Sequence, residues 1–195
     1  RCDRAGGILC LEISEGKMDI DLTLAILDTH LDGDFIVYPV PVSEDTPARL
    51  TEIERQFNVR YPSEFISHVC GKFSGIFVEV REELWPRQKA IDVCPAWSFL
   101  YAFYTYTSGT DSAEWMRLDL ATEKFQKDTG LIASPILKLV GDPDVYCASS
   151  VGEIVQYRHE SGSLEPVDKD FWKLLYEESA ALRNRKDMML DGFKP

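Results

Sequence analysis

Residues 136–157, ILKLVGDPDVYCASSVGEIVQY, decide the fold of this chain. Three short runs rich in apolar and β-branched side chains, at 136–140, 145–147 and 153–157, are separated by a Gly-Asp-Pro-Asp turn and a Ser-Ser-Val-Gly turn. Short strands joined by such turn residues pair with their neighbours along the chain. The stretch therefore predicts an antiparallel meander.

Upstream of the meander, helical patterns alternate with further strands. Pro47 opens a helix in which apolar side chains recur every three to four residues, namely Leu50, Ile53 and Phe57. Pro62 opens a second helix whose inward stripe is Phe65, Ile66 and Val69. Strands are expected within 76–81 and 98–107, and a helix over 112–127 with the stripe Trp115, Leu118, Ala121 and Phe125.

Downstream, Asp168 can cap a closing helix that turns Phe171, Leu174 and Leu175 inward. Glu177 and Glu178 are expected to face solvent. This order of helices, strands and a last helix predicts an α+β fold, with a mostly antiparallel sheet and helices packed on one face.

Three segments are expected along the chain. Residues 1–42 read as an ordered N-terminal extension, with a strand near 8–13, a helix over 21–30 and an extended run at 35–40 that Pro39 and Pro41 mark as a sheet edge or connector. Residues 43–182 form the main domain, and 183–195 a polar C-terminal tail.

Composition narrows the class of partner. The 195 residues include 33 acidic and 21 basic side chains, giving a formal net charge of -12. Such a chain repels a phosphate backbone and attracts a basic protein, so nucleic acid is not expected as a ligand. Five scattered cysteines without a regular spacing indicate a reduced, cytoplasmic setting, and no stretch is apolar enough to suggest a membrane span.

Several segments together resemble the SUKH superfamily, which includes the yeast Smi/Knr regulators and many bacterial immunity proteins. They are the helix start at 61–65 (YPSEF), the run 139–147, the run 152–160 ending in His159-Glu160, and the closing FWKLL at 171–175. The family usually has Asn-Gly-Gly where this chain reads Phe73-Ser74-Gly75. The resemblance implies an α+β fold that binds other proteins and has no shared catalytic residue.

The sequence predicts neither catalysis nor a metal or cofactor site. His68 and Cys70 are too close along a helix to form the i, i+4 pair that metal sites favour. His159 and Glu160 are neighbours at a strand end, where adjacent side chains diverge. The loop at 108–111 lacks the lysine and glycine spacing of a phosphate-binding loop.

The candidate partner-binding residues lie on the 142–160 hairpin. Asp142, Asp144, Glu153 and Glu160 can meet a basic target, and an aromatic anchor is expected from Tyr157, Trp97 or Tyr101. A solvated hairpin is an equally open interpretation. The expected function is that of an immunity protein that neutralises a cognate, basic bacterial toxin; the alternative is a Smi/Knr-type interaction scaffold without a toxin partner. A third hypothesis, an enzyme of unrecognised type, would require a concave pocket with convergent titratable groups.

Overall fold

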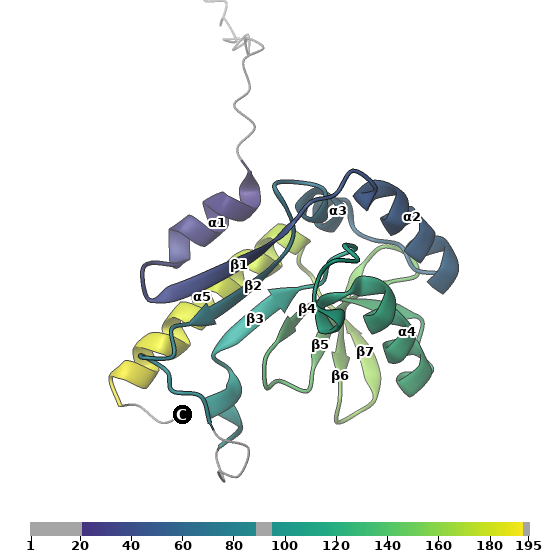
Figure 1. The fold of residues 1–195 in the computed structure, drawn as a ribbon. Helices are drawn as coiled ribbons and strands as arrows, with labels where there is room; N and C mark the ends of the chain where they lie inside the picture. Colours follow the sequence, from purple (N-terminus) through teal and green to yellow (C-terminus); the bar gives the residue numbers. More distant parts are fainter. Residues whose placement is uncertain (1–20, 89–94, 193–195) are drawn as a thin grey trace, which may run out of the picture.

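The structure, a computed structural model, describes residues 21–88 and 95–192. Its centre is an antiparallel sheet of seven strands in the order β1-β2-β3-β4-β5-β6-β7 (Figure 1). The strands are β1 (Phe35–Pro41), β2 (Phe73–Val80), β3 (Ala102–Thr105), β4 (Ala133–Leu139), β5 (Val145–Ser149), β6 (Ile154–Arg158) and β7 (Ser163–Pro166). The predicted α+β class and antiparallel meander are confirmed.

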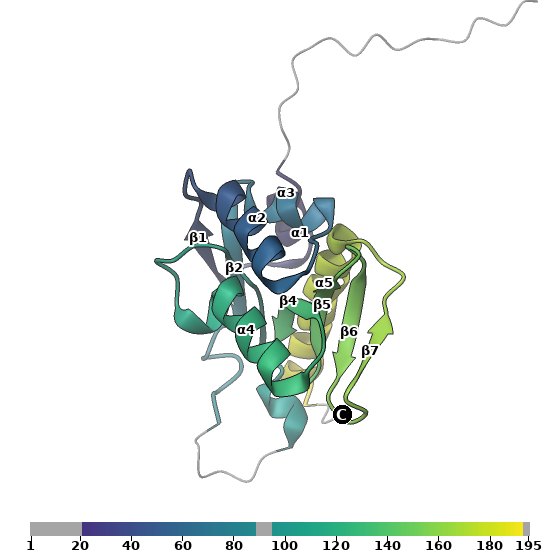
Figure 2. The same cartoon turned by 90° about the vertical axis from the view of Figure 1, so that its right-hand side faces the viewer.

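The helices pack on this sheet in two groups. They are α1 (Leu22–His30), α2 (Thr46–Phe57), α3 (Ser63–Val69), α4 (Leu118–Thr129) and α5 (Phe171–Leu190), with short 3-10 turns η1 (Ala96–Phe99) and η2 (Glu114–Met116). The long α5 lies against one face of the sheet, with α1 beside it, and α4 lies on the other side of β4 and β5 (Figures 1 and 2).

The strand register explains why α4 and α5 meet different side chains. Val145 pairs with Tyr157, so these two residues share a face, whereas Tyr146 points to the other. Phe125 of α4 packs edge-on against Tyr157, at 5.2 Å between ring centroids. The Tyr146 hydroxyl instead donates to Glu178 of α5. The sequence predicted helices on one face of the sheet, whereas in the structure α4 lies on the face opposite α5.

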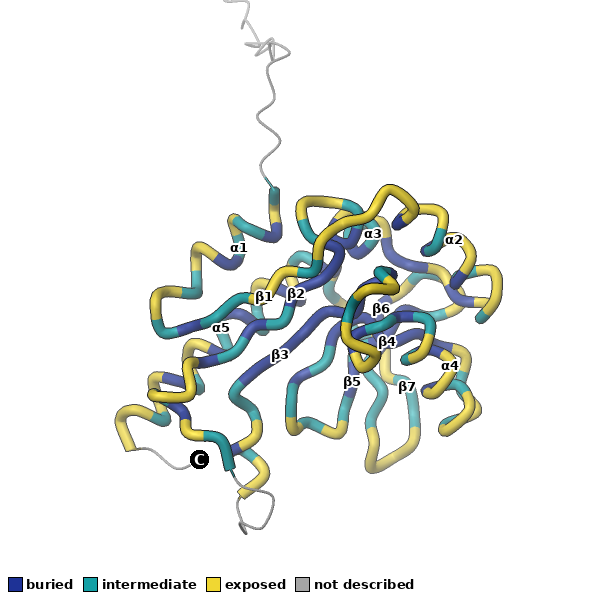
Figure 3. The backbone as a smooth tube through the Cα atoms, in the orientation of Figure 1, coloured by how far each residue is buried: buried dark blue, intermediate teal, exposed yellow. Residues whose placement is uncertain are grey.

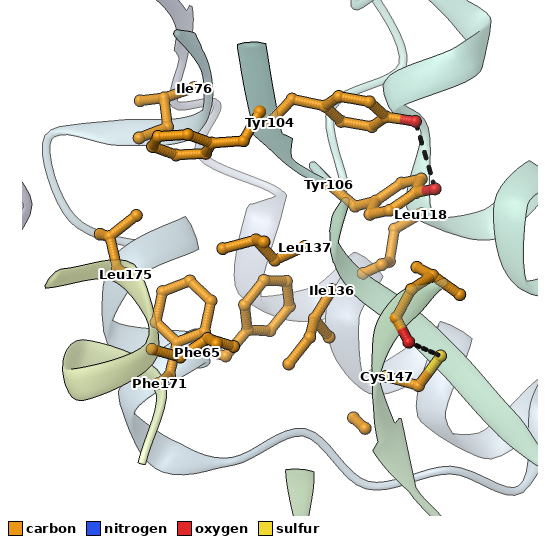
Figure 4. Packing of buried hydrophobic residues seen from close by; sticks show 14 of the residues in the cluster. Phe65, Ile76, Tyr104, Tyr106, Leu118, Ile136, Leu137, Cys147, Phe171 and Leu175 are labelled. Atoms are coloured by element: carbon orange, nitrogen blue, oxygen red, sulfur yellow. Dashed lines mark hydrogen bonds between the residues drawn. The ribbon is translucent and has the colours of Figure 1, made fainter. Parts of the chain in front are cut away.

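The core lies between α5, α3 and the middle of the sheet. β3 and β4 are buried along nearly their whole length (Figure 3). Phe65 and Phe171 meet at 5.2 Å between ring centroids, next to Leu175, and Leu118 and the hydroxyl-bonded pair Tyr104 and Tyr106 belong to the same cluster (Figure 4). Each large apolar side chain removed from water in this way contributes about 1.5–3 kcal/mol.

The described part of the N-terminal segment joins the same sheet. β1 pairs with β2 along its full length as the edge strand, as Pro39 and Pro41 suggested. α1 packs on α5, and the buried Thr23 hydroxyl lies 2.8 Å from His68 Nδ1. The strand expected at 8–13 lies outside the described residues.

Details of the closing helix differ from the prediction. Its cap is Asp170, whose carboxylate accepts from Lys173 N–H, and not Asp168. The helix continues to Leu190, so much of the predicted 183–195 tail is helical, because Lys186 is buried and paired with Asp34. Glu178 does not face solvent but accepts a hydrogen bond from Tyr146, and burial raises its pKa.

Two central elements begin later than predicted. The region expected as one strand over 98–107 divides into η1 and β3. The helix expected from 112 starts as α4 at Leu118, so Trp115 belongs to the short η2 turn instead of a helical stripe.

Along residues 21–88 and 95–192, no helix combines the length and the apolar character that a membrane span requires.

Candidate functional site: a groove beside an acidic pocket

The structure brings Asp142, Asp144 and Glu160 together at one end of the β5–β6 hairpin. With Glu165 and Arg158 they line a pocket of about 640 Å³ between the β4–β5 and β6–β7 turns. Four carboxylates and one guanidinium face this pocket, so its net charge is negative. The acidic character predicted for the hairpin is therefore concentrated at this end.

Asp144 is already engaged inside the protein. Its carboxylate accepts from Arg158 Nη1 at 2.9 Å and from the His159 N–H at 2.8 Å. Although partial burial acts to raise the pKa of Asp144, these two hydrogen bonds and the charge of Arg158 hold it below its ordinary value. Asp144 thus fixes the shape of the pocket instead of offering a free charge.

Glu153 lies at the opposite end of the hairpin. It belongs to the β5–β6 turn and lines a different pocket with Lys169 and Lys173, at the start of α5. Five residues of strand at about 3.3 Å each separate the two ends. The sequence analysis grouped Glu153 with the other acidic residues, whereas the structure places it apart from them.

Tyr157 lines a groove between α4 and strands β4–β6. The groove has a volume of about 800 Å³, with Tyr157 and Val145 on the sheet side and Ala121 and Phe125 on the helix side. Pro143 lines both the groove and the acidic pocket, so the two hollows adjoin. A groove with a mainly apolar lining, to which Lys124 and Asp128 of α4 also contribute, therefore opens directly beside a negatively charged pocket.

Trp115 stands at the rim of this groove with 52% of its surface exposed. Its indole packs edge-on against Tyr104 at 4.8 Å and against Phe77 at 5.6 Å between ring centroids. The η2 turn that carries it is held at its end by the Thr107 N–H, which donates to the Met116 carbonyl. A rigidly held but exposed indole is a typical anchor for a partner.

Trp115 was not among the predicted anchors. Of those, Tyr157 lines the groove, whereas Trp97 is partly buried against the core and Tyr101 lies under the Arg87 guanidinium, 3.7 Å from the ring centroid. The polar run at 108–112, just before Trp115, was the only sign that the helix would start late.

Lys138 links the groove to the acidic pocket. Its ammonium group, on the groove side of β4, donates to the carbonyls of Asp142 at 2.8 Å and Asp144 at 3.3 Å. Burial lowers the pKa of Lys138, against the opposing effect of the nearby carboxylates. The β4–β5 turn is consequently held in one shape at the point where groove and pocket meet.

The titratable residues considered for chemistry lie apart from one another. His68 is buried between the hydroxyls of Thr23 and Thr105, and burial lowers its pKa to about 4. His159 lies at the groove, and Cys70, directly after α3, and Cys147 on β5 are free thiols. Within the described ranges, no group of three or more His, Cys, Asp or Glu side chains is arranged to hold a metal ion.

Comparison of the chain with protein-family models, with curated proteins and with solved structures gave no match. The SUKH resemblance therefore stays a prediction from the sequence.

Proposed function

We propose that this chain is a non-catalytic domain that binds a basic protein, and that it acts as an immunity protein that neutralises a cognate bacterial toxin. One observation carries the proposal: an apolar groove with an exposed tryptophan at its rim opens beside a pocket lined by four carboxylates. A buried aromatic anchor supplies affinity in protein interfaces, and complementary charge supplies speed and specificity.

Both the net charge of the chain and the local charge of the pocket support a basic partner. The whole chain carries a net charge of -12, which attracts a cationic protein over distances of about 10 Å at moderate salt. Locally, Asp142 and Glu160 face the pocket that adjoins the groove. The SUKH resemblance, which implies protein binding and often toxin neutralisation, points to the same class of function.

The first test is capture of the partner. The tagged full chain is incubated with lysate of the source cells at low and at high salt, and proteins that co-purify are identified by mass spectrometry and assayed for toxicity. We expect a basic protein that is retained at low salt, released at high salt and no longer toxic when bound. A non-toxic partner would favour the scaffold alternative. A partner retained equally at low and high salt would contradict the proposed role of charge in binding.

Matched charge variants locate the binding surface. The double variant Asp142→Asn/Glu160→Lys changes the charge of the acidic pocket while the asparagine keeps the oxygen that accepts from Asp144 N–H. The control Glu153→Lys/Asp168→Asn makes the same changes of residue type in the pocket at the other end of the hairpin. We expect the first variant to release the partner at low salt and the control to retain it.

A further inference from the structure

The groove and the acidic pocket adjoin at Pro143, and the residues that line them differ in chemistry. The groove presents aromatic and aliphatic surface from Trp115, Phe125 and Tyr157. The pocket, reached across Pro143, presents Asp142 and Glu160. A ligand that fills both must therefore carry an apolar part and a cationic part.

The carboxylates of this pocket are not equally available. Arg158 donates through Nη1 to Asp144 and through Nε to Glu165, so these two carboxylates share one guanidinium and are already hydrogen-bonded within the protein. Within residues 21–88 and 95–192 the carboxylate of Asp142 accepts only the Asp144 N–H, although the Lys138 ammonium group donates to the Asp142 carbonyl. Between residues 95 and 192 and in 21–88, no side-chain hydrogen bond or ion pair engages Glu160. The pocket thus keeps negative charge that an incoming cation can neutralise.

The distance between the two parts limits the ligand. Tyr157 and Glu160 are three residues apart, so their Cα atoms lie at most about 11 Å from each other. An extended peptide covers this distance in about three residues. The groove volume of about 800 Å³ is also in the range that accommodates a few side chains of a partner.

We infer that the site recognises one extended segment of its partner, in which a large apolar side chain enters the groove against Tyr157 and a lysine or arginine two to four residues away enters the acidic pocket. This inference rests on the proposed function, because it names the partner chemistry of the same site. Recognition requires both parts of the site, because the groove supplies affinity and the acidic pocket selects a segment with a basic residue.

The test is selection of linear peptides from a random displayed library on the immobilised full chain, without any assumption about the natural partner. We expect the enriched peptides to share an aromatic or large aliphatic residue with a lysine or arginine two to four positions away. Synthetic copies are then titrated by fluorescence anisotropy against the wild type, Trp115→Ala, Asp142→Asn/Glu160→Lys and the control Glu153→Lys/Asp168→Asn.

The expected losses differ between the variants. Trp115→Ala should weaken binding by about 30-fold or more, as loss of an aromatic anchor does. The acidic-pocket variant should weaken it by about 10-fold at low salt and less at high salt, and the control by less than about 2-fold.

The inference would be overturned by enriched peptides without a basic residue, or by peptides whose affinity is unchanged by both the groove variant and the pocket variant. Failure to enrich any peptide would also overturn it, because the site would then not read a linear segment. In that last case, a protein captured from lysate and released by Asp142→Asn/Glu160→Lys would leave the proposed function standing, so the two failures are distinguishable.

Discussion

The two faces of the sheet carry aromatic clusters of similar make-up that differ in what covers them. On the α5 side, Phe65, His68, Phe171 and Trp172 pack with ring centroids 5.1–6.4 Å apart, and α5 itself supplies two of the four rings. We call this the closed cluster. On the α4 side, Tyr38, Phe77, Tyr104 and Trp115 pack with neighbouring ring centroids 4.8–6.5 Å apart. We call this the open cluster.

The two clusters differ in how much of the chain lies over them. A helix of 20 residues lies over the closed cluster and leaves Phe65 and Phe171 with no exposed surface. A turn of three residues carries Trp115 in the open cluster and leaves half of its indole in contact with water. Equal ring chemistry therefore serves stability on one face and is available for recognition on the other.

The largest effect is expected from removing a ring of the closed cluster. Phe171→Ala should lower the free energy of unfolding by about 3–5 kcal/mol, because a buried ring is replaced by a cavity between α5, α3 and the sheet. Urea unfolding followed by circular dichroism measures it. Trp115→Ala is the matched aromatic control, with an expected loss of about 1 kcal/mol from its two edge-on contacts. Equal losses for both variants would break the comparison.

The closed cluster should also make stability depend on pH through His68. Burial lowers its folded pKa to about 4, with a smaller opposing effect of Asp21, whereas the unfolded value is 6.5. The unfolded state binds more protons between these values, so stability is full above pH 6.5 and falls as pH decreases towards 4, by up to about 3 kcal/mol. His68→Gln should remove this part of the pH dependence; an unchanged profile would contradict it.

Much of the fold could be predicted from local patterns, because those patterns report burial directly. Pro47 with Leu50, Ile53 and Phe57 predicted α2 with nearly the observed bounds. β7 was missed, since Ser163–Pro166 has only Leu164 as an apolar signal and ends in a proline. The length of α5 was missed because Lys186, polar in sequence, is buried against Asp34, far along the chain.

The site was predictable only in part. Tyr157 and the acidic turn residues could be named as candidates because they stand in the hairpin that decides the fold. The separation of Glu153 from Asp142 follows from strand length: five residues in each strand put the two turns at opposite ends. The role of Trp115 depends on where α4 begins, and that is set by tertiary bonds of Thr107 to Met116 and Leu118.

The open cluster should influence binding more than stability. Trp115→Ala is expected to weaken binding of the captured partner by about 30-fold, corresponding to about 2 kcal/mol, because the anchor at the groove rim is lost. Tyr176→Ala serves as the control, since Tyr176 is 46% exposed and also packs edge-on, but lies on α5. Surface plasmon resonance gives both dissociation constants. Similar weakening by both variants would mean that the binding surface extends to α5.

A smaller effect on stability is expected from a substitution at the junction of the groove and the acidic pocket. Asp144→Asn should reduce stability by about 1 kcal/mol, because the charge-assisted bond to Arg158 is weakened. The folded pKa of Asp144 is depressed, so its contribution is present above the unfolded value of about 4 and is lost as pH falls through the folded value. Asp168→Asn is the control, and thermal unfolding at pH 7 and pH 3 measures both. A loss equal at the two pH values would contradict this account.

Hydrogen exchange of the full chain with and without its captured partner tests the central claim most directly. The account predicts slowed exchange in η2 and the start of α4, at the β4–β5 turn and at the end of β6, where groove and acidic pocket meet. It predicts no change at the Glu153 turn or in α1 and α5. Slowed exchange confined to the Glu153 end, or to the face covered by α5, would contradict the assignment of the open face as the binding surface.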